Sequence, residues 1–267
     1  MITVGIDIGT GSTKGIVLED NEKIIGRALA PTKGTPSDMA SRILREAVEN
    51  SKINIDEVDY VASTGYGRYM MEERKIQISD LTTTGRGAHF LYEKFNPEFI
   101  LDIGTQSSRT LKIDERGKIV QFKMNERCAA GSGRFIERCS KYLDIPMEKI
   151  SETALKGENP QRISSVCAVL SETEIINHVS LGTPVDDILM GVFLSIADRA
   201  STLLRRLKMD SDVYLAGGLV HMPAMKRALE EVLDYNVHSN PDAHYAAAIG
   251  AARLGHQRLL KQQAITQ

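Results

Sequence analysis

The chain has 267 residues, a length that can bury one large core or two lobes of ordinary size. Its 33 Lys and Arg against 35 Asp and Glu give a formal charge of −2, and it has 5% aromatic residues and no tryptophan, so we expect no nucleic-acid partner and no base-stacking platform. No apolar run approaches the ~20 residues of a membrane helix, so we expect no membrane partner. No signal peptide is visible, and the three cysteines include no C-x-x-C pair. Both observations indicate a reducing, cytoplasmic location.

The pattern of the N-terminal part predicts strands followed by helices. Strands are expected over residues 2–8, 14–18, 24–29 and 58–63. Ser37 is predicted to cap a helix that continues to about Asn50. Its buried face is formed by four apolar residues at helical spacing, Ile43, Leu44, Ala47 and Val48. A second helix is expected from about Gly87 to Lys94, before the break at Asn96-Pro97.

The rest of the chain begins with a hairpin over 99–113 and a third strand over 118–123. Helices are then expected over 131–143, 147–155, 167–181, 185–207 and 222–233, strands over 212–216 and 236–238, and a final helix from His244. This mixture predicts an α/β fold. We expect an N-terminal lobe over 1–96, to which the helix 244–262 crosses back, and a C-terminal lobe over 97–243.

The most informative pattern is a short motif that occurs twice. Asp7-Ile8-Gly9-Thr10-Gly11-Ser12-Thr13-Lys14 is matched by Asp102-Ile103-Gly104-Thr105-Gln106-Ser107-Ser108-Arg109. Each copy follows an apolar run and continues into a second strand-like stretch. Because there are only two copies, the pattern indicates a duplicated lobe and not a solenoid. The two hairpins, each with a carboxylate before its turn, are expected to grip one phosphate chain.

The chemistry of the first turn suits phosphate binding. The chain lacks the P-loop pattern, and the dinucleotide pattern would need a glycine where Lys14 stands. Gly9 and Gly11 let exposed backbone N–H groups approach an anion. Hydroxyl and ammonium donors come from the rest of the turn, Thr10, Ser12, Thr13 and Lys14. Asp7 would hold Mg²⁺ through water. The alternative is an ordinary glycine-rich hairpin, which the duplication disfavours.

A second glycine pair, Gly217-Gly218, follows a predicted strand. It suits contact with a nucleoside, although a plain strand-to-helix turn also explains it. Taken together, these motifs resemble the acetate and sugar kinase/Hsp70/actin superfamily. The resemblance implies two ribonuclease-H-like lobes with ATP and Mg²⁺ in the cleft between them. Asp7 to Lys14 is similar to the first phosphate motif of that superfamily, Asp102 to Arg109 to the second, and Val213 to Gly218 to its adenosine motif.

Two cysteines are predicted at or just before helix N-termini, where backbone N–H groups stabilise a thiolate. Cys128 lies in Arg127-Cys128-Ala129-Ala130-Gly131, and Cys167 in Val166-Cys167-Ala168-Val169-Leu170. Either they are small buried residues, or each chain contributes two ligands to a cluster shared across a two-fold axis. Cys139 is expected to be a structural thiol. Glu172 and Glu174 are either solvated helix charges or contacts near the nucleotide.

The sequences around these cysteines are similar to activators of 2-hydroxyacyl-CoA dehydratases and to the ATP-hydrolysing subunits of benzoyl-CoA reductase. The resemblance implies one [4Fe–4S] cluster per dimer, bound by Cys128 and Cys167 of each subunit. The chain departs from the activator pattern at Ser107, which stands where a carboxylate is usual. The Cys167-Ala168-Val169-Leu170 pattern favours the reductase-type subunit.

The resemblance also implies an ATPase that passes electrons to an acyl-CoA reductase or dehydratase component. Asp7 and Asp102 would organise Mg²⁺ and the attacking water, and Gln106 would position that water or a phosphate. Gly104, Thr105 and Gln106 would bind phosphates, and Gly217 and Gly218 the nucleoside of ATP or ADP. The implied partners are a second copy or a homologous subunit across the cluster, and ferredoxin or flavodoxin as electron donor. The alternatives are a small-molecule kinase without a cluster and a nucleotide-dependent regulatory protein.

Overall fold

The computed structural model describes residues 1–125, 131–165 and 167–266. The chain divides into two compact units. One unit comprises Met1–Pro97, Ile113–Ile119 and Asp242–Gln267, and the other Glu98–Lys112 and Val120–Pro241. Each unit contains one five-stranded sheet, with strand order β3-β2-β1-β4-β5 in the first and β10-β9-β6-β7-β8 in the second. Read from opposite ends the two orders correspond strand for strand, so the repeat in the sequence is also a repeat of topology.

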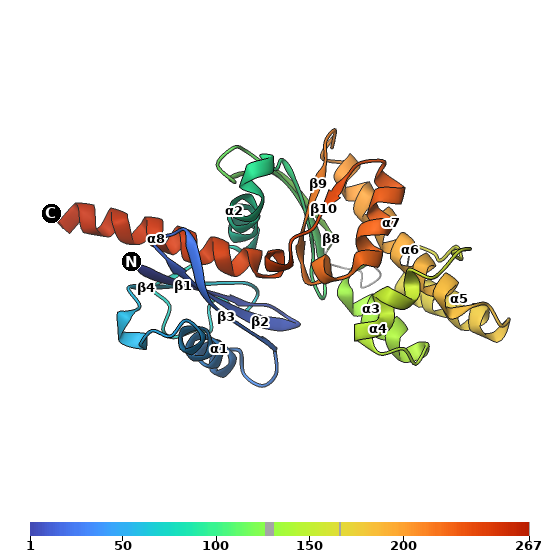
Figure 1. Ribbon diagram of the computed structural model, residues 1–267, viewed down its shortest axis with the longest axis horizontal. Helices are drawn as coiled ribbons and strands as arrows, with labels where there is room; N and C mark the ends of the chain where they lie inside the picture. The colour runs from blue at the N-terminus through green and yellow to red at the C-terminus, as the bar shows by residue number, and fades with distance from the viewer. Residues whose placement is uncertain (126–130, 166, 267) are drawn as a thin grey trace. The chain divides into compact units, whose positions relative to one another are not determined.

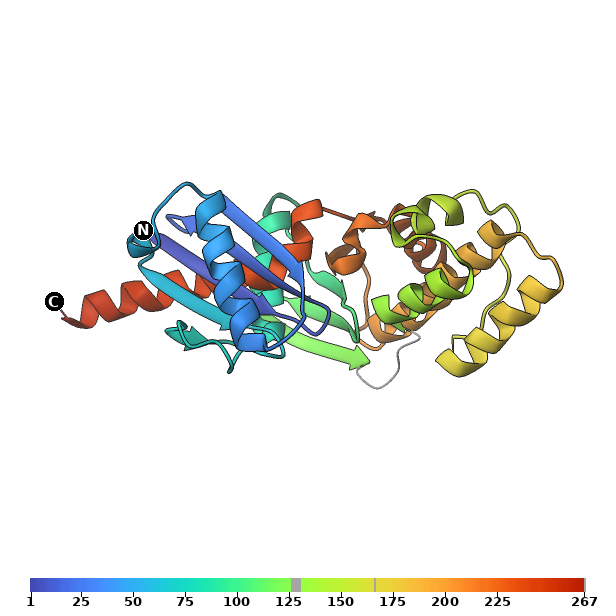
Figure 2. The same cartoon turned by 90° about the horizontal axis from the view of Figure 1, so that it is seen from below.

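The first sheet is formed by β1 (Ile2–Ile8), β2 (Ser12–Glu19), β3 (Lys23–Pro31), β4 (Tyr60–Thr64) and β5 (Ile76–Gln77). The strand β1 is antiparallel to β2 and parallel to β4. Successive side chains of a strand point to opposite faces of its sheet. Val17 accordingly packs in the cluster with α1 (Pro36–Asn50), whereas its neighbours Ile16 and Leu18 pack against Ala248, Ile249 and Ala252 of α8 (Ala246–Thr266). Figure 2 shows α1 lying across its face of the sheet.

The helix α8 packs on α2 (Asp80–Tyr92) and on the first sheet through contacts between backbones (Figure 1). A Cβ atom added to Gly250 would lie 1.8 Å from the Thr83 carbonyl oxygen, and one added to Gly87 would lie 1.7 Å from that of Ala246. A Cβ atom on Gly5 of β1 would lie 1.9 Å from the Ala248 carbonyl oxygen. Small residues therefore allow the C-terminal helix to lie closer to its neighbours than any side chain would permit.

The second sheet is formed by β6 (Phe99–Ile103), β7 (Ser108–Ile113), β8 (Ile119–Asn125), β9 (Val213–Gly217) and β10 (Val237–His238). The helices of this part of the chain are α3 (Gly133–Tyr142), α4 (Met147–Ala154), α5 (Ala168–Ser180), α6 (Val185–Arg205) and α7 (Pro223–Leu233). The strand β6 pairs antiparallel with β7 and parallel with β9. Its first three residues, Phe99, Ile100 and Leu101, are fully buried. They anchor the strand that leads to the second turn motif.

Most of the predicted elements are present, with three differences. The helix α1 is capped by Thr35, whose hydroxyl accepts a hydrogen bond from the Asp38 N–H at 3.3 Å, so the prediction that Ser37 caps it is wrong. The helix α2 begins at Asp80, not near Gly87, and the two-residue strand β5 was not predicted. Thr35 takes the cap because Pro36 occupies the first helical position, where its missing N–H costs nothing.

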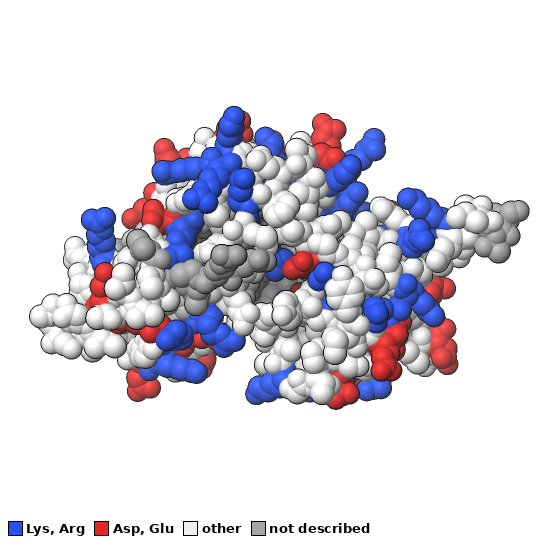
Figure 3. Space-filling view, turned by 180° about the vertical axis from the view of Figure 1, so that it is seen from behind, with Lys and Arg blue, Asp and Glu red and all other residues white. Residues whose placement is uncertain are grey.

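The surface agrees with the nearly balanced charge of the chain. Lys and Arg side chains and Asp and Glu side chains both occur over much of the face in Figure 3. Within the described residues, no helix combines the length and the apolar character that crossing a membrane would require.

Candidate functional site

The first turn motif joins β1 to β2 and is closed by a hydrogen bond from the Gly9 N–H to the Ser12 carbonyl at 3.1 Å. The antiparallel register places Asp7 opposite Lys14. Their side chains form an ion pair with 3.0 Å between Lys14 Nζ and Asp7 Oδ2, and Asp7 is only 7% exposed. The motif therefore presents a shielded carboxylate and ammonium at the end of a buried strand.

The other residues of this turn differ in their access to solvent. Thr10 is exposed, and Gly11 and Ser12 are half-buried, so their donors can reach a ligand. Thr13 is fully buried and its hydroxyl lies 3.0 Å from that of Thr32. Thr32 in turn donates to the Gly9 carbonyl at 2.8 Å. Thr13 thus supports the turn from within the unit.

The second turn motif joins β6 to β7 with the same construction. The Gly104 N–H donates to the Ser107 carbonyl at 2.9 Å, and the register places Asp102 opposite Arg109. Both Arg109 Nε and Nη2 lie 3.4 Å from Ser107 Oγ. Thr105 is half-buried and Gln106 is exposed. Corresponding positions of the two motifs, aligned from the sequence alone, therefore have the same pairing in the structure.

The carboxylates of Asp7 and Asp102 each lie beside a glycine of the neighbouring parallel strand. Gly217 is the last residue of β9, and Gly65 directly follows β4. A Cβ atom at Gly217 would lie 2.4 Å from Asp102 Oδ1, and one at Gly65 would lie 2.4 Å from Asp7 Oδ1. Both glycines have positive φ, +84° for Gly217 and +87° for Gly65, where other residues are strained. The sequence predicts Gly217 as a nucleoside contact, whereas Gly65 is not among the predicted site residues. The signal for Gly65 was its position in Thr64-Gly65-Tyr66-Gly67, directly after a buried strand.

Gly218 is half-buried and begins the short 3-10 helix that follows Gly217. It therefore lies next to the glycine that adjoins Asp102. The strands β6 and β9 run parallel and end together. Asp102, the turn at Gly104, and the pair Gly217 and Gly218 therefore lie at the same end of these strands.

Cys167 is the N-cap residue of α5, as predicted, and its side chain is half-buried. Hydrogen bonds from the backbone N–H groups of Leu170 and Val169 lower the pKa of its thiol, and the nearby Arg199 guanidinium acts in the same direction. Cys139 on α3 is fully buried, and burial raises the pKa of its thiol to about 12. Cys167 is thus suited to act as a thiolate ligand, and Cys139 is an inert core residue.

Cys128 lies outside the described residues. Among the residues that the structure describes, there is no group of three or more His, Cys, Asp or Glu side chains arranged to hold a metal ion. The arrangement around Cys167 nevertheless fits a metal-bound thiolate, since the sulfur is accessible and its anionic form is stabilised by backbone donors.

Of the two alternatives for Glu172, the structure excludes the solvated helix charge. Its side chain accepts hydrogen bonds from Arg138 at 2.8 Å and from the Tyr142 hydroxyl at 3.1 Å, and the residue is only 8% exposed. Glu174 accepts a hydrogen bond from the Ser164 N–H at 2.6 Å. Glu172 therefore joins α5, which begins after Cys167, to α3.

The different pKa values of the two thiols predict different reactivity. In the metal-free protein we expect iodoacetamide to alkylate Cys167 at neutral pH, with a half-maximal rate below the pH of about 8.5 that is typical of a free thiol. Cys139 should stay unmodified until the protein is unfolded in denaturant. Peptide mass mapping over a pH series measures both. Labelling of Cys139 as fast as Cys167 in the folded protein would contradict the assignment.

Two sheets with the same strand order, each carrying the same Asp-bearing turn, define the class of two-lobed nucleotide-binding proteins of the actin and Hsp70 type. The chain belongs to the BadF/BadG/BcrA/BcrD ATPase family, whose sequence profile matches residues 4–255. The resemblance and the α/β two-lobe fold expected from the sequence are thereby confirmed.

Similar proteins cover nearly the whole chain. The activator of lactoyl-CoA dehydratase from Anaerotignum propionicum is 34% identical over 98% of this chain and 100% of its own length. A benzoyl-CoA reductase subunit from Thauera aromatica is 35% identical over 97% of this chain and 96% of its own. The structure of the activator of 2-hydroxyisocaproyl-CoA dehydratase from Clostridium difficile, with bound ADPNP, has a TM-score of 0.92 at 30% identity, covering 99% of this chain and 97% of that one.

Proposed function

We propose that the protein is an ATP-dependent electron-transfer component that serves an acyl-CoA reductase or dehydratase. Its relatives are named as dehydratase activators and as a reductase subunit at nearly equal identity, so the proposed partner is an acyl-CoA-processing component of either class. The observation that carries the proposal is a network of hydrogen bonds. It joins the second turn motif, through α3, to α5, the helix that begins after Cys167.

The first part of this network lies between the turn and α3. The Gly133 N–H donates to the Gly104 carbonyl at 2.9 Å, and the Arg134 N–H donates to the Thr105 carbonyl at 2.9 Å. The Ser108 hydroxyl also donates to the Gly131 carbonyl. Three backbone carbonyls around the turn and the start of α3 are thus held by direct contacts. A displacement of the turn would displace the start of α3 with it.

The second part of the network lies between α3 and α5. The Arg138–Glu172 ion pair has one partner on each helix, and the Tyr142 hydroxyl reinforces it. Glu172 lies little more than one helical turn beyond Cys167. We infer that α3 and α5 move together when the second turn motif moves. Nucleotide binding would thereby shift the population of positions that the proposed cluster ligands adopt.

In the proposed ATPase reaction, the two turn motifs bind nucleotide phosphates through their backbone N–H groups, with Thr10, Ser12 and Lys14 as side-chain donors. Asp7 and Asp102 would hold Mg²⁺ through water and orient the attacking water, and Gln106, exposed on its turn, would position that water or a phosphate. Thr13 keeps the first turn in shape. Gly217 and Gly218 would contact the nucleoside.

The proposed cluster ligands are Cys167 and Cys128, with the same pair from a second copy or a homologous subunit. When bound, a [4Fe–4S] cluster would supply a single low-potential electron to the partner, with ferredoxin or flavodoxin as donor. Cys167 adjoins two exposed apolar side chains, Val169 at 64% and Leu170 at 54% exposure. Apolar groups beside the proposed shared ligand suit a contact with the second subunit.

Replacing Cys167 by serine tests the proposal. Anaerobically purified wild-type protein should be brown and contain about four iron atoms per dimer. Cys167→Ser should lose the iron and the colour yet still bind ADP, because the turn motifs are unchanged. Cys139→Ala is the matched control and should keep both. Iron analysis, visible spectra and ADP titration measure these outcomes.

Iron-free wild-type protein, or full iron content in Cys167→Ser, would overturn the electron-transfer assignment. ATP-dependent phosphorylation of a sugar or a carboxylic acid by such iron-free protein would identify the small-molecule kinase instead.

A further inference from the structure

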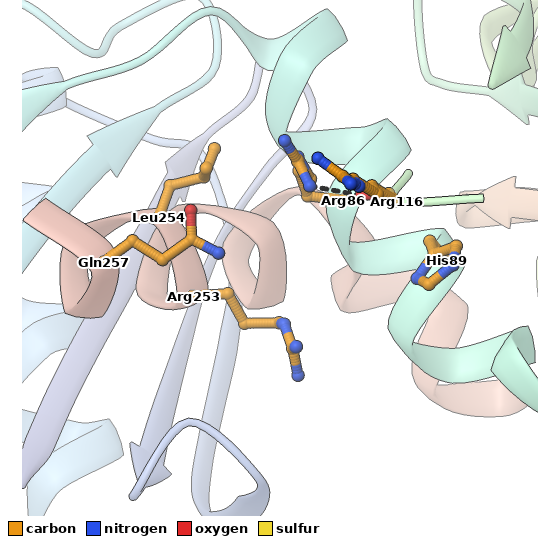
Figure 4. A pocket seen from close by; sticks show the side chains of 6 residues that line it. All are labelled: Arg86, His89, Arg116, Arg253, Leu254 and Gln257. Carbon is orange, nitrogen blue, oxygen red and sulfur yellow. Dashed lines mark hydrogen bonds between the residues drawn. The ribbon is translucent and has the colours of Figure 1, made fainter. Parts of the chain in front are cut away.

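A cationic pocket lies in the first unit, away from both turn motifs in sequence. It has a volume of about 280 Å³ and lies between α2, α8 and the turn that connects β7 to β8. Its lining residues are Arg86, His89, Arg116, Arg253, Leu254 and Gln257. Figure 4 shows Arg86 and Arg116 side by side, opposite the residues that α8 contributes. Three arginines thus line one small volume, with no carboxylate in its lining.

The charges of these arginines are not neutralised by direct contacts. Within the part of the chain that the structure describes, none of the three guanidiniums forms an ion pair with Asp or Glu. Arg86 Nη1 donates to the backbone carbonyl of Arg116, and Arg86 Nε is buried without a hydrogen-bond partner. A buried donor without an acceptor costs about 1–3 kcal/mol, and clustered like charges add repulsion. An anion bound in the pocket would offset the repulsion between the arginines.

The pocket is held in shape before any ligand arrives. Arg253 Nη1 donates to the Asn21 carbonyl at 2.9 Å, and its guanidinium carbon lies 4.4 Å from the ring centroid of Phe90. Burial lowers the pKa of this guanidinium, which also lies in the fields of Glu93, Arg86 and Glu22. Close contacts at Gly87 and Gly250 fix the two helices against each other. A site with such fixed donors loses little entropy on binding.

We propose that this pocket binds a phosphate group, either as inorganic phosphate or as part of a small phosphate ester. Guanidinium forks match the oxygens of phosphate and bind them in pairs. The volume lies just below the roughly 300–1,000 Å³ of typical small-molecule sites. That size suits a phosphate or a small ester and is too small for a whole nucleotide, so the site is distinct from the proposed ATP site.

Isothermal titration of the full-length protein with inorganic phosphate tests this proposal. The protein is first saturated with Mg²⁺ and ADP, so that the proposed nucleotide site is occupied. Saturable binding with a Kd below about 1 mM is expected. Arg116→Gln and Arg86→Gln should each weaken binding about tenfold, as expected for the loss of a charge-assisted hydrogen bond. Lys118→Gln, an exposed cation that is outside the pocket lining, is the matched control and should bind phosphate normally.

A parallel titration with glycerol phosphate distinguishes free phosphate from the phosphate of an ester by which of the two binds more tightly. Absence of binding, equal loss in Lys118→Gln, or equally tight binding of acetate would overturn the proposal. Neither iron nor ATP hydrolysis enters the measurement, so its failure is distinguishable from failure of the proposed function. Arg116 is an exposed turn residue, so its replacement also guards against loss of binding through misfolding.

Discussion

Asp102→Asn is expected to lower the rate of ATP hydrolysis by about 100-fold or more, the loss that follows when one preorganised electrostatic group is removed from an active site. Asn has the size and shape of Asp, so the close approach of Gly217, where an added Cβ would lie 2.4 Å from Asp102 Oδ1, can persist. The change removes the negative charge that would hold Mg²⁺ and orient water. Phosphate release at saturating ATP measures the effect.

Asp212→Asn is the matched control for Asp102→Asn. Asp212 precedes β9, at the opposite end of that strand from Gly217, and its carboxylate bonds His238 Nε2 at 2.8 Å. This variant should keep the wild-type rate. If Asp102→Asn hydrolyses ATP at the wild-type rate, or if both variants lose activity equally, Asp102 has no role in metal binding or water activation.

Gly250→Ala is expected to destabilise the first unit by about 2 kcal/mol. Two effects oppose each other. Alanine favours a helix over glycine by about 1 kcal/mol, but the new Cβ atom would lie 1.8 Å from the Thr83 carbonyl oxygen, so α8 and α2 must move apart. Overpacking against backbone costs more than propensity returns, because neither helix can yield by a change of rotamer. Denaturant unfolding monitored by circular dichroism measures the difference.

Gly255→Ala on the same helix separates the two effects. Its added Cβ atom would lie 3.2 Å from Tyr60 Cδ1, a side-chain atom that can shift by a few tenths of an ångström. The helix-propensity gain is the same as at Gly250, so this variant should be near wild type in stability or above it. Equal stability of the two variants would show that the backbone contact at Thr83 does not determine how α8 packs.

Two features that the sequence pattern does not settle, the start of α2 and the role of Glu172, have a common cause. The start of α2 was missed because Thr82, Thr83 and Thr84 are poor helix formers and Gly85 follows them. In the structure the Thr83 hydroxyl forms a hydrogen bond with the Thr64 hydroxyl at 2.9 Å. Gly87, which has no side chain, allows α8 to pack closely against α2. Tertiary contacts therefore stabilise a helix that local propensity does not favour. The sequence leaves two interpretations of Glu172 open for the same reason, since its partner Arg138 lies on another helix.

The repeated turn, its carboxylates and the helix position of Cys167 could be predicted from the amino-acid sequence, because these features depend on residues close together in the chain. Strand alternation and turn glycines act over a few residues, so their pattern is legible without a structure. The folded chain was needed to show which glycine faces each carboxylate, which helix carries the partner of Glu172, and that Arg86, Arg116 and Arg253 line one pocket. Those relations join segments distant in sequence, and they follow from how helices and strands pack once the chain has folded.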